Sequence, residues 1–167
     1  MLLAYADGAK DPDAFARAFG RSVDQVEASF AAFVEQRFAD LKVAMADPPQ
    51  QVAADNVGAL RARAASAPNN FLSQLALGQA LLTAGDAAGA KAPLERAAAL
   101  APQAMGTNSP RALLAGIVEK DDPTRARSLL RELLTYDHTN IVAARKLAAL
   151  AATARATDDE DYALRVV

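Results

Sequence analysis

The chain has 167 residues, a formal net charge of −2 and no cysteine. This length suits one domain or a short array of repeats, and the absence of cysteine excludes disulfides and thiolate zinc sites and leaves the compartment undetermined. No long basic stretch is present, which argues against nucleic-acid binding, and no apolar run approaches the roughly 18 residues of a membrane span. Because the chain is rich in alanine, the strongest helix former, we expect an all-α protein.

Residues 1–46 are expected to form N-terminal helices that belong to the tail of an upstream domain. The start of the chain lacks the basic and apolar regions of a signal peptide. Its apolar opening leads us to expect a fragment of a longer protein. Asp11 is predicted to cap a short helix that has Pro12 at its first position, and Gly20 is expected to end it.

Ser22 and Gln25 form a capping-box pattern at the start of a long helix predicted over 23–46. The apolar residues of this helix recur every three or four positions, so they are expected to line one continuous stripe. The stripe consists of Val23, Val26, Phe30, Val34, Phe38, Leu41 and Met45.

Residues 47–68 are interpreted as a degenerate repeat or capping helix. Asp47 is expected to cap a helix over about 49–66, which would carry Val52 and Leu60 and end before Pro68.

The most regular stretch, residues 69–102, reads as two helices joined by the turn Ala84-Gly85-Asp86. With Phe71 as position 1, its apolar and small residues fall at positions 7, 8, 11, 15, 20, 24, 27 and 32. These are Leu77, Gly78, Leu81, Gly85, Ala90, Leu94, Ala97 and Pro102. The series resembles the tetratricopeptide (TPR) repeat. The resemblance implies stacked antiparallel hairpins in a right-handed solenoid, for which we expect about eight helices.

Each of these positions has an expected structural role. Gly78 and Ala90 are expected where the two helices approach most closely, because a branched side chain would not fit there. Leu94, with the other leucines, supplies buried area. Ala97 is expected to face the next helix, and Pro102 to end the second helix.

Residues 109–138 are predicted to form a second TPR-like unit and residues 139–167 a third, partial one. Ser109 and either Asp121 or Asp122 are expected to cap the two helices of the second unit. Thr139 or Asn140 is expected to cap the first helix of the third unit. A capping box is predicted over 157–160.

A wider resemblance covers most of the chain. Residues 2–38, with a short Phe/Ala helix and a Ser-capped long helix, look like the tail of the gluzincin-type peptidase-MA-like domains of bacterial TPR proteins. Residues 109–150 are similar to the C-terminal arrays of those proteins. The catalytic signature of that family is H-E-x-x-H, and this chain has one histidine. The resemblance therefore implies a non-catalytic accessory region, whose metallopeptidase active site would lie upstream.

No catalytic, cofactor-binding or metal-binding residue is predicted. His138 has no second histidine or cysteine to work with, and it is interpreted as a loop or helix-end residue. The acidic run 158–161 lacks the ligand spacing of an EF-hand loop and suits a helix N-terminus. No serine has the G-x-S-x-G context of a hydrolase nucleophile.

The remaining candidate site is a concave face formed by the first helix of each unit, which would bind a protein or peptide with an acidic group. In the first unit the face is expected to comprise Leu72, Leu75, Gln79 and Leu82. Further along it would comprise Asn108, Arg111, Ala115 and Val118, and then Val142, Arg145, Ala149 and Ala152. Two alternatives stay open: the face is free, or the N-terminal hairpin or an upstream domain covers it. Self-association through Tyr162, Leu164, Val166 and Val167 is a third hypothesis.

Overall fold

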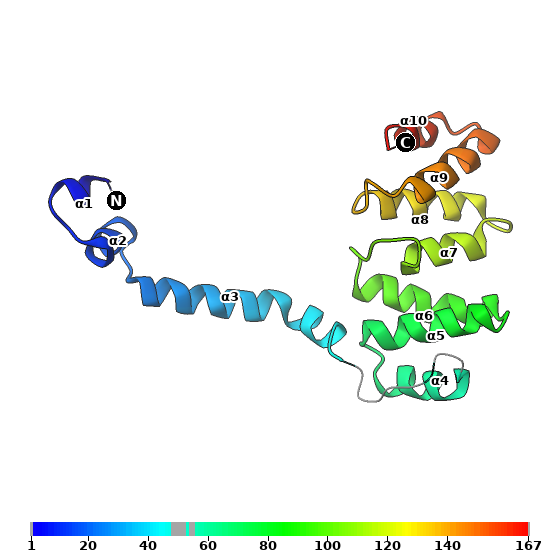
Figure 1. The fold of residues 1–167 in the computed structure, drawn as a ribbon, viewed down its shortest axis with the longest axis horizontal. Coiled ribbons are helices and arrows are strands. Elements are labelled where there is room, and N and C mark those ends of the chain that lie inside the picture. Colours follow the sequence, from blue (N-terminus) through cyan, green and yellow to red (C-terminus); the bar gives the residue numbers. More distant parts are fainter. Residues whose placement is uncertain (1, 48–52, 54–55, 167) are drawn as a thin grey trace. The chain divides into compact units, whose positions relative to one another are not determined.

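The computed structural model describes residues 2–47, 53 and 56–166. These residues form ten α-helices and no strand, which confirms the predicted all-α class (Figure 1). About eight helices were expected, and the described residues form ten. The chain divides into two compact units, Met1–Lys42 and Val43–Val167.

Unit 1 contains α1 (Leu2–Ala6), α2 (Asp11–Phe19) and most of α3 (Val23–Ala44). The predicted capping box is present at the start of α3: the Ser22 amide donates to Gln25 Oε1 at 3.0 Å, and the Gln25 amide donates to Ser22 Oγ at 3.2 Å. Gly20 ends α2 at φ 69°, as expected. Asp11 does not cap α2. It is the first residue of the helix, and Lys10 occupies the cap position without a side-chain hydrogen bond.

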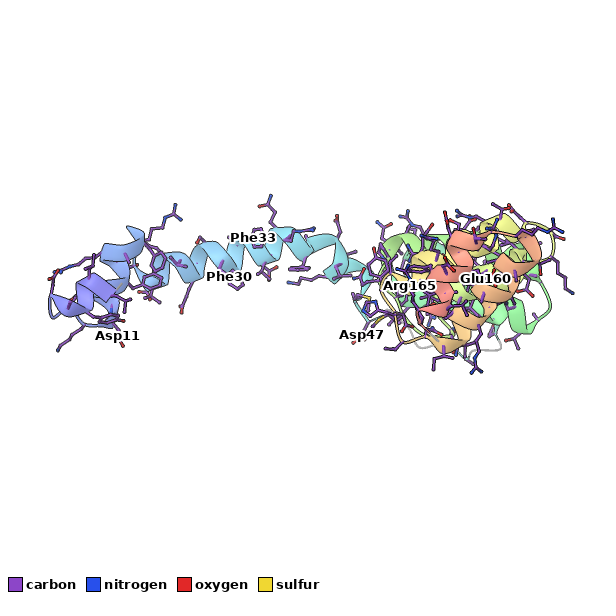
Figure 2. All side chains as sticks on the ribbon, turned by 90° about the horizontal axis from the view of Figure 1, so that it is seen from above. Asp11, Phe30, Phe33, Asp47, Glu160 and Arg165 are labelled. Carbon is purple, nitrogen blue, oxygen red and sulfur yellow. The ribbon has the colours of Figure 1, made fainter. Side chains whose placement is uncertain are left out.

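The predicted apolar stripe of α3 is not covered within unit 1. Figure 2 labels Phe30 and Phe33 on this helix, and their side chains are 65% and 58% exposed. Of the predicted stripe, Val23, Phe30, Phe38 and Met45 are exposed, and Val26, Val34 and Leu41 are half-buried. The period of the pattern therefore predicted the helix correctly, but no element of unit 1 packs along its apolar side.

Unit 2 is a series of helices in which each helix packs against the next one in the chain. They are α4 (Val57–Ser66), α5 (Phe71–Thr83), α6 (Ala87–Leu100), α7 (Pro110–Val118), α8 (Pro123–Leu134), α9 (Ile141–Ala154) and α10 (Thr157–Leu164). Figure 1 shows them as successive layers from α4 to α10, and among the described residues α8 and α10 make a further, smaller contact. One buried cluster runs through the layers, from Leu60 on α4 to Ala163 on α10.

Side-chain caps begin most helices of unit 2. Each capping oxygen accepts a hydrogen bond from the backbone N–H three residues later, at 2.8–3.4 Å. The caps are Asn56, Asn70, Asp86, Ser109, Asp122 and Asn140. The capping box predicted over 157–160 is absent, because Ala156 is the cap residue of α10 and makes no side-chain hydrogen bond.

Helix α4 begins later than the sequence predicts. Asn56, which was expected inside a helix over 49–66, is the N-cap of α4. The expected start of that helix, including Val52, lies outside the described residues.

In residues 69–102, helices α5 and α6 approach each other closely at Gly78 and Leu94. A Cβ atom added to Gly78 would lie 2.6 Å from both Cγ and Cδ2 of Leu94, which is fully buried. Ala90 is also fully buried, and Gly85 turns the chain at φ 82°, a left-handed conformation that favours glycine. Gly78 therefore stands where the two helices approach, and Gly85 lies in the turn between them.

Ala97 occupies a different environment from the expected one. It is fully buried in a small cluster with Phe71 and Ala101, to which residues of α5, α6 and the following connector contribute. The sequence predicted that Ala97 would face the next helix, α7. In the structure the side chain packs in the cluster that contains Phe71, the first residue of α5.

Candidate functional site

The expected binding face is only partly open on α5. Leu72 is exposed, with 38% of its surface accessible, whereas Leu75, Gln79 and Leu82 are half-buried. Leu75 and Leu82 also pack against the main buried cluster. Leu72 is therefore the member of this set that is available to a partner.

Arg111 is held in place by its neighbours on α8 and in the connector. Its Nε lies 3.1 Å from Glu132 Oε2, its Nη1 donates to the Pro102 carbonyl, and its guanidinium lies over the ring of Tyr136. Only 13% of its side chain is exposed. Arg111 also lines a cavity of about 450 Å³ between α6, α7 and α8. These contacts join α7 to α8, and they leave Arg111 with a structural role.

The face on α9 is the most open part of the expected surface. Val142 is 63% exposed, and Arg145, Ala149 and Ala152 are exposed as well. Of the later positions expected on this surface, Ala115 is fully buried. Asn108 is exposed and Val118 is half-buried, so the exposed members of the predicted surface are Leu72, Asn108 and the α9 residues.

A second candidate site lies between α8, α9 and α10. A cavity of about 500 Å³ is lined by Arg127, Arg131, Arg155, Ala156, Thr157, Asp158 and Asp159. The Asp159 carboxylate accepts hydrogen bonds from Arg127 Nη1 at 2.7 Å and from Arg131 Nη1 at 2.6 Å. The side chains of Arg127 and Asp159 are 16% and 17% exposed, so this ion pair is largely shielded from water. Charge-assisted hydrogen bonds of this kind orient both guanidinium groups.

The same arginines continue into an adjoining cavity. Arg131 lies over the ring of Tyr162, 4.7 Å from its centroid, which is within cation–π distance. A cavity of about 230 Å³ beside it is lined by Arg131, Asp158, Asp161, Tyr162 and Arg165. Arg131 and Asp158 therefore border both cavities. Figure 2 labels Glu160 on α10 and Arg165, the residue that follows the helix.

Arg155 reaches this site from an unusual backbone position. It ends α9 at φ 55° and ψ 37°, and it is the one non-glycine residue at positive φ in the part of the chain that the structure describes. A side chain in the left-handed region costs about 1 kcal/mol or more, and glycine or asparagine normally occupies this position. An arginine here places its side chain at the cavity at the expense of stability.

The arginine cluster was not predicted from the sequence. The acidic run 158–161 was interpreted as capping and a solvated turn, whereas Asp159 pairs with two arginines that lie 28 and 32 positions earlier. The spacing of Arg127 and Arg131, four residues apart on one helix, puts both on the same face and was the available signal. The partner on α10 was not visible in the sequence.

The described residues contain no group of three or more His, Cys, Asp or Glu side chains placed to hold a metal ion. His138 is exposed in the turn between α8 and α9. None of the described helices is long and apolar enough to cross a membrane. No family model, curated protein or solved structure gives a match to this chain.

Proposed function

We propose that the chain is a non-catalytic, TPR-like scaffold that binds a protein or peptide. The binding face is formed by the exposed residues of the first helix of each unit, α5, α7 and α9. The observation that carries the proposal is the packing of unit 2, in which each helix contacts the next and one core passes through all the layers. Repeat proteins are built in this way, and their extended surfaces serve as binding faces.

The exposed side chains on that face favour a peptide with apolar and acidic groups. Leu72 and Val142 are exposed apolar side chains, and Arg145 is an exposed cation one helical turn from Val142. An extended or helical peptide would bury its apolar side chains against Leu72 and Val142 and place a carboxylate beside Arg145.

The test is a selection of displayed random peptides on the full chain, followed by fluorescence anisotropy of the enriched peptides. We expect these peptides to share an acidic residue beside apolar ones. Arg145→Ala is expected to weaken their binding about tenfold, because a hydrogen bond to a charged group contributes roughly 1.5 kcal/mol. Val142→Ser is expected to weaken binding without a large loss of stability, since Val142 is exposed.

Arg125→Ala is the matched control, because it removes the same charge from an exposed position at the start of α8, outside this face. It is expected to leave peptide binding unchanged. If the enriched peptides bind Arg145→Ala and Val142→Ser as tightly as they bind the wild type, the proposed face is not the binding site.

A further inference from the structure

The arginine cavity between α8, α9 and α10 contains guanidinium N–H groups that do not donate hydrogen bonds to Asp159. A guanidinium carries five N–H donors. Asp159 accepts one hydrogen bond from each of Arg127 and Arg131, and these bonds hold the two groups in place. Arg127 Nε is buried and has no hydrogen-bond partner. Because this atom is shielded from solvent, the donors accessible to a ligand belong to Arg131, whose side chain is 45% exposed, and to the exposed Arg155.

The charge of the cavity also favours an anion. Three arginines, Arg127, Arg131 and Arg155, face two aspartates in its lining, which leaves an excess of one positive charge. Asp159 is neutralised by its two partners, so the ligand would meet the exposed side chains of Arg155 and Arg131. Asp158 is the carboxylate that opposes an anion there.

We propose that this cavity binds the phosphate group of a small molecule. Arginine forks match the geometry of phosphate oxygens. A volume of about 500 Å³ exceeds what one phosphate ion fills and lies within the range of small-molecule sites. The adjoining cavity, which shares Arg131 and Asp158 and is also lined by Arg165, extends the site for a ligand longer than a single phosphate. This proposal is independent of the peptide face.

The left-handed backbone of Arg155 is a second observation that supports the proposal. Glycine at φ 55° would relieve the strain, so an arginine at this position is explained by the use of its side chain. Residues that serve binding at the expense of stability show this trade-off when they are replaced. Arg155→Gly therefore separates a ligand-binding role from a structural one.

The experiment is isothermal titration calorimetry of the full chain with pyrophosphate and with inorganic phosphate. The thermal unfolding of each variant is measured in parallel. We expect saturable binding at one site, with pyrophosphate the tighter ligand because it carries more charge and reaches further along the cavity. Arg155→Gly is expected to weaken pyrophosphate binding about fivefold or more while its melting temperature stays equal or rises. Asp158→Asn is expected to tighten binding, since it removes the opposing charge.

Arg125→Ala is the matched control, because it removes one positive charge from an exposed position on α8, the helix of Arg127 and Arg131, without lining the cavity. It is expected to leave pyrophosphate binding unchanged. The proposal is overturned if the wild-type chain does not bind pyrophosphate, or if Arg155→Gly binds it as tightly as the wild type. It is also overturned if Arg125→Ala loses as much affinity as Arg155→Gly, because the binding would then reflect overall charge.

Discussion

Gly78→Ala tests the close contact between α5 and α6 with the smallest possible change. The added methyl carbon would lie 2.6 Å from Leu94 Cγ and Cδ2, whereas carbon atoms in contact prefer about 3.5–4.0 Å. Leu94 is fully buried, so it has to move by about 1 Å within a packed core. Overpacking of this kind lowers the free energy of unfolding by about 1–3 kcal/mol, whereas the higher helix propensity of alanine raises it by about 1 kcal/mol.

We therefore expect Gly78→Ala to lower the free energy of unfolding by about 1 kcal/mol and the melting temperature by roughly 4 °C. Urea denaturation and thermal unfolding measure the two quantities. Gly78→Leu is expected to cost more, about 3 kcal/mol. In the double variant with Leu94→Val, the total loss should be smaller than the sum of the single losses, because the shorter side chain vacates the space that the new methyl group needs.

Gly116→Ala is the matched control, since it is the same substitution within α7. A Cβ atom at Gly116 would meet only Lys146 Nζ, at 3.8 Å, which is an ordinary contact with the end of a flexible side chain. This variant is expected to be more stable than the wild type by about 0.5–1 kcal/mol. If Gly78→Ala were stabilised as much as Gly116→Ala, the close contact with Leu94 would not exist.

Two further predictions concern buried and exposed hydrogen bonds. Asn70 caps α5 and donates to the Ala46 carbonyl at 2.6 Å. Asn70→Ala is expected to cost about 2–3 kcal/mol in urea denaturation, and Asn70→Ser to recover about 1 kcal/mol through its capping oxygen; equal losses would mean that the cap contributes nothing. The hydrogen bond to Asp11 is the main cause that raises the pKa of Tyr5 above 10.0, followed by desolvation and the carboxylate charge. This contribution to stability is present below about pH 10 and lost as the pH rises through the folded-state pKa. Asp11→Asn should lower the pKa of Tyr5 in an NMR titration, and an unchanged curve would exclude the contact.

The caps and turns of unit 2 were largely predictable because they depend on residues close together in the sequence. Asn140 caps α9 through the amide of Ala143, and Asp122 caps α8 through that of Arg125, each three residues later. The exception at α10 has a local reason as well: Ala156 takes the cap position, and Thr157 falls inside the helix.

The candidate sites were less predictable, because they depend on residues brought together from distant helices. The expected face included Arg111, whose guanidinium is held by Glu132, 21 positions later. The arginine cavity was missed because Asp159 reaches Arg127 from a helix 32 positions away in the chain. Helical periodicity assigns each side chain to a face, but it does not say what that face meets.

By itself, the sequence determined the all-α class, the periodic helices and the small residues of the α5–α6 contact, since helix propensity, capping and a 3.6-residue period act over a few residues. Only the tertiary structure decided which polar groups pair and which apolar faces are covered. The stripe of α3 has the spacing of a buried face, yet Phe30 is 65% exposed. Burial depends on a partner surface elsewhere in space, and local periodicity carries no information about it.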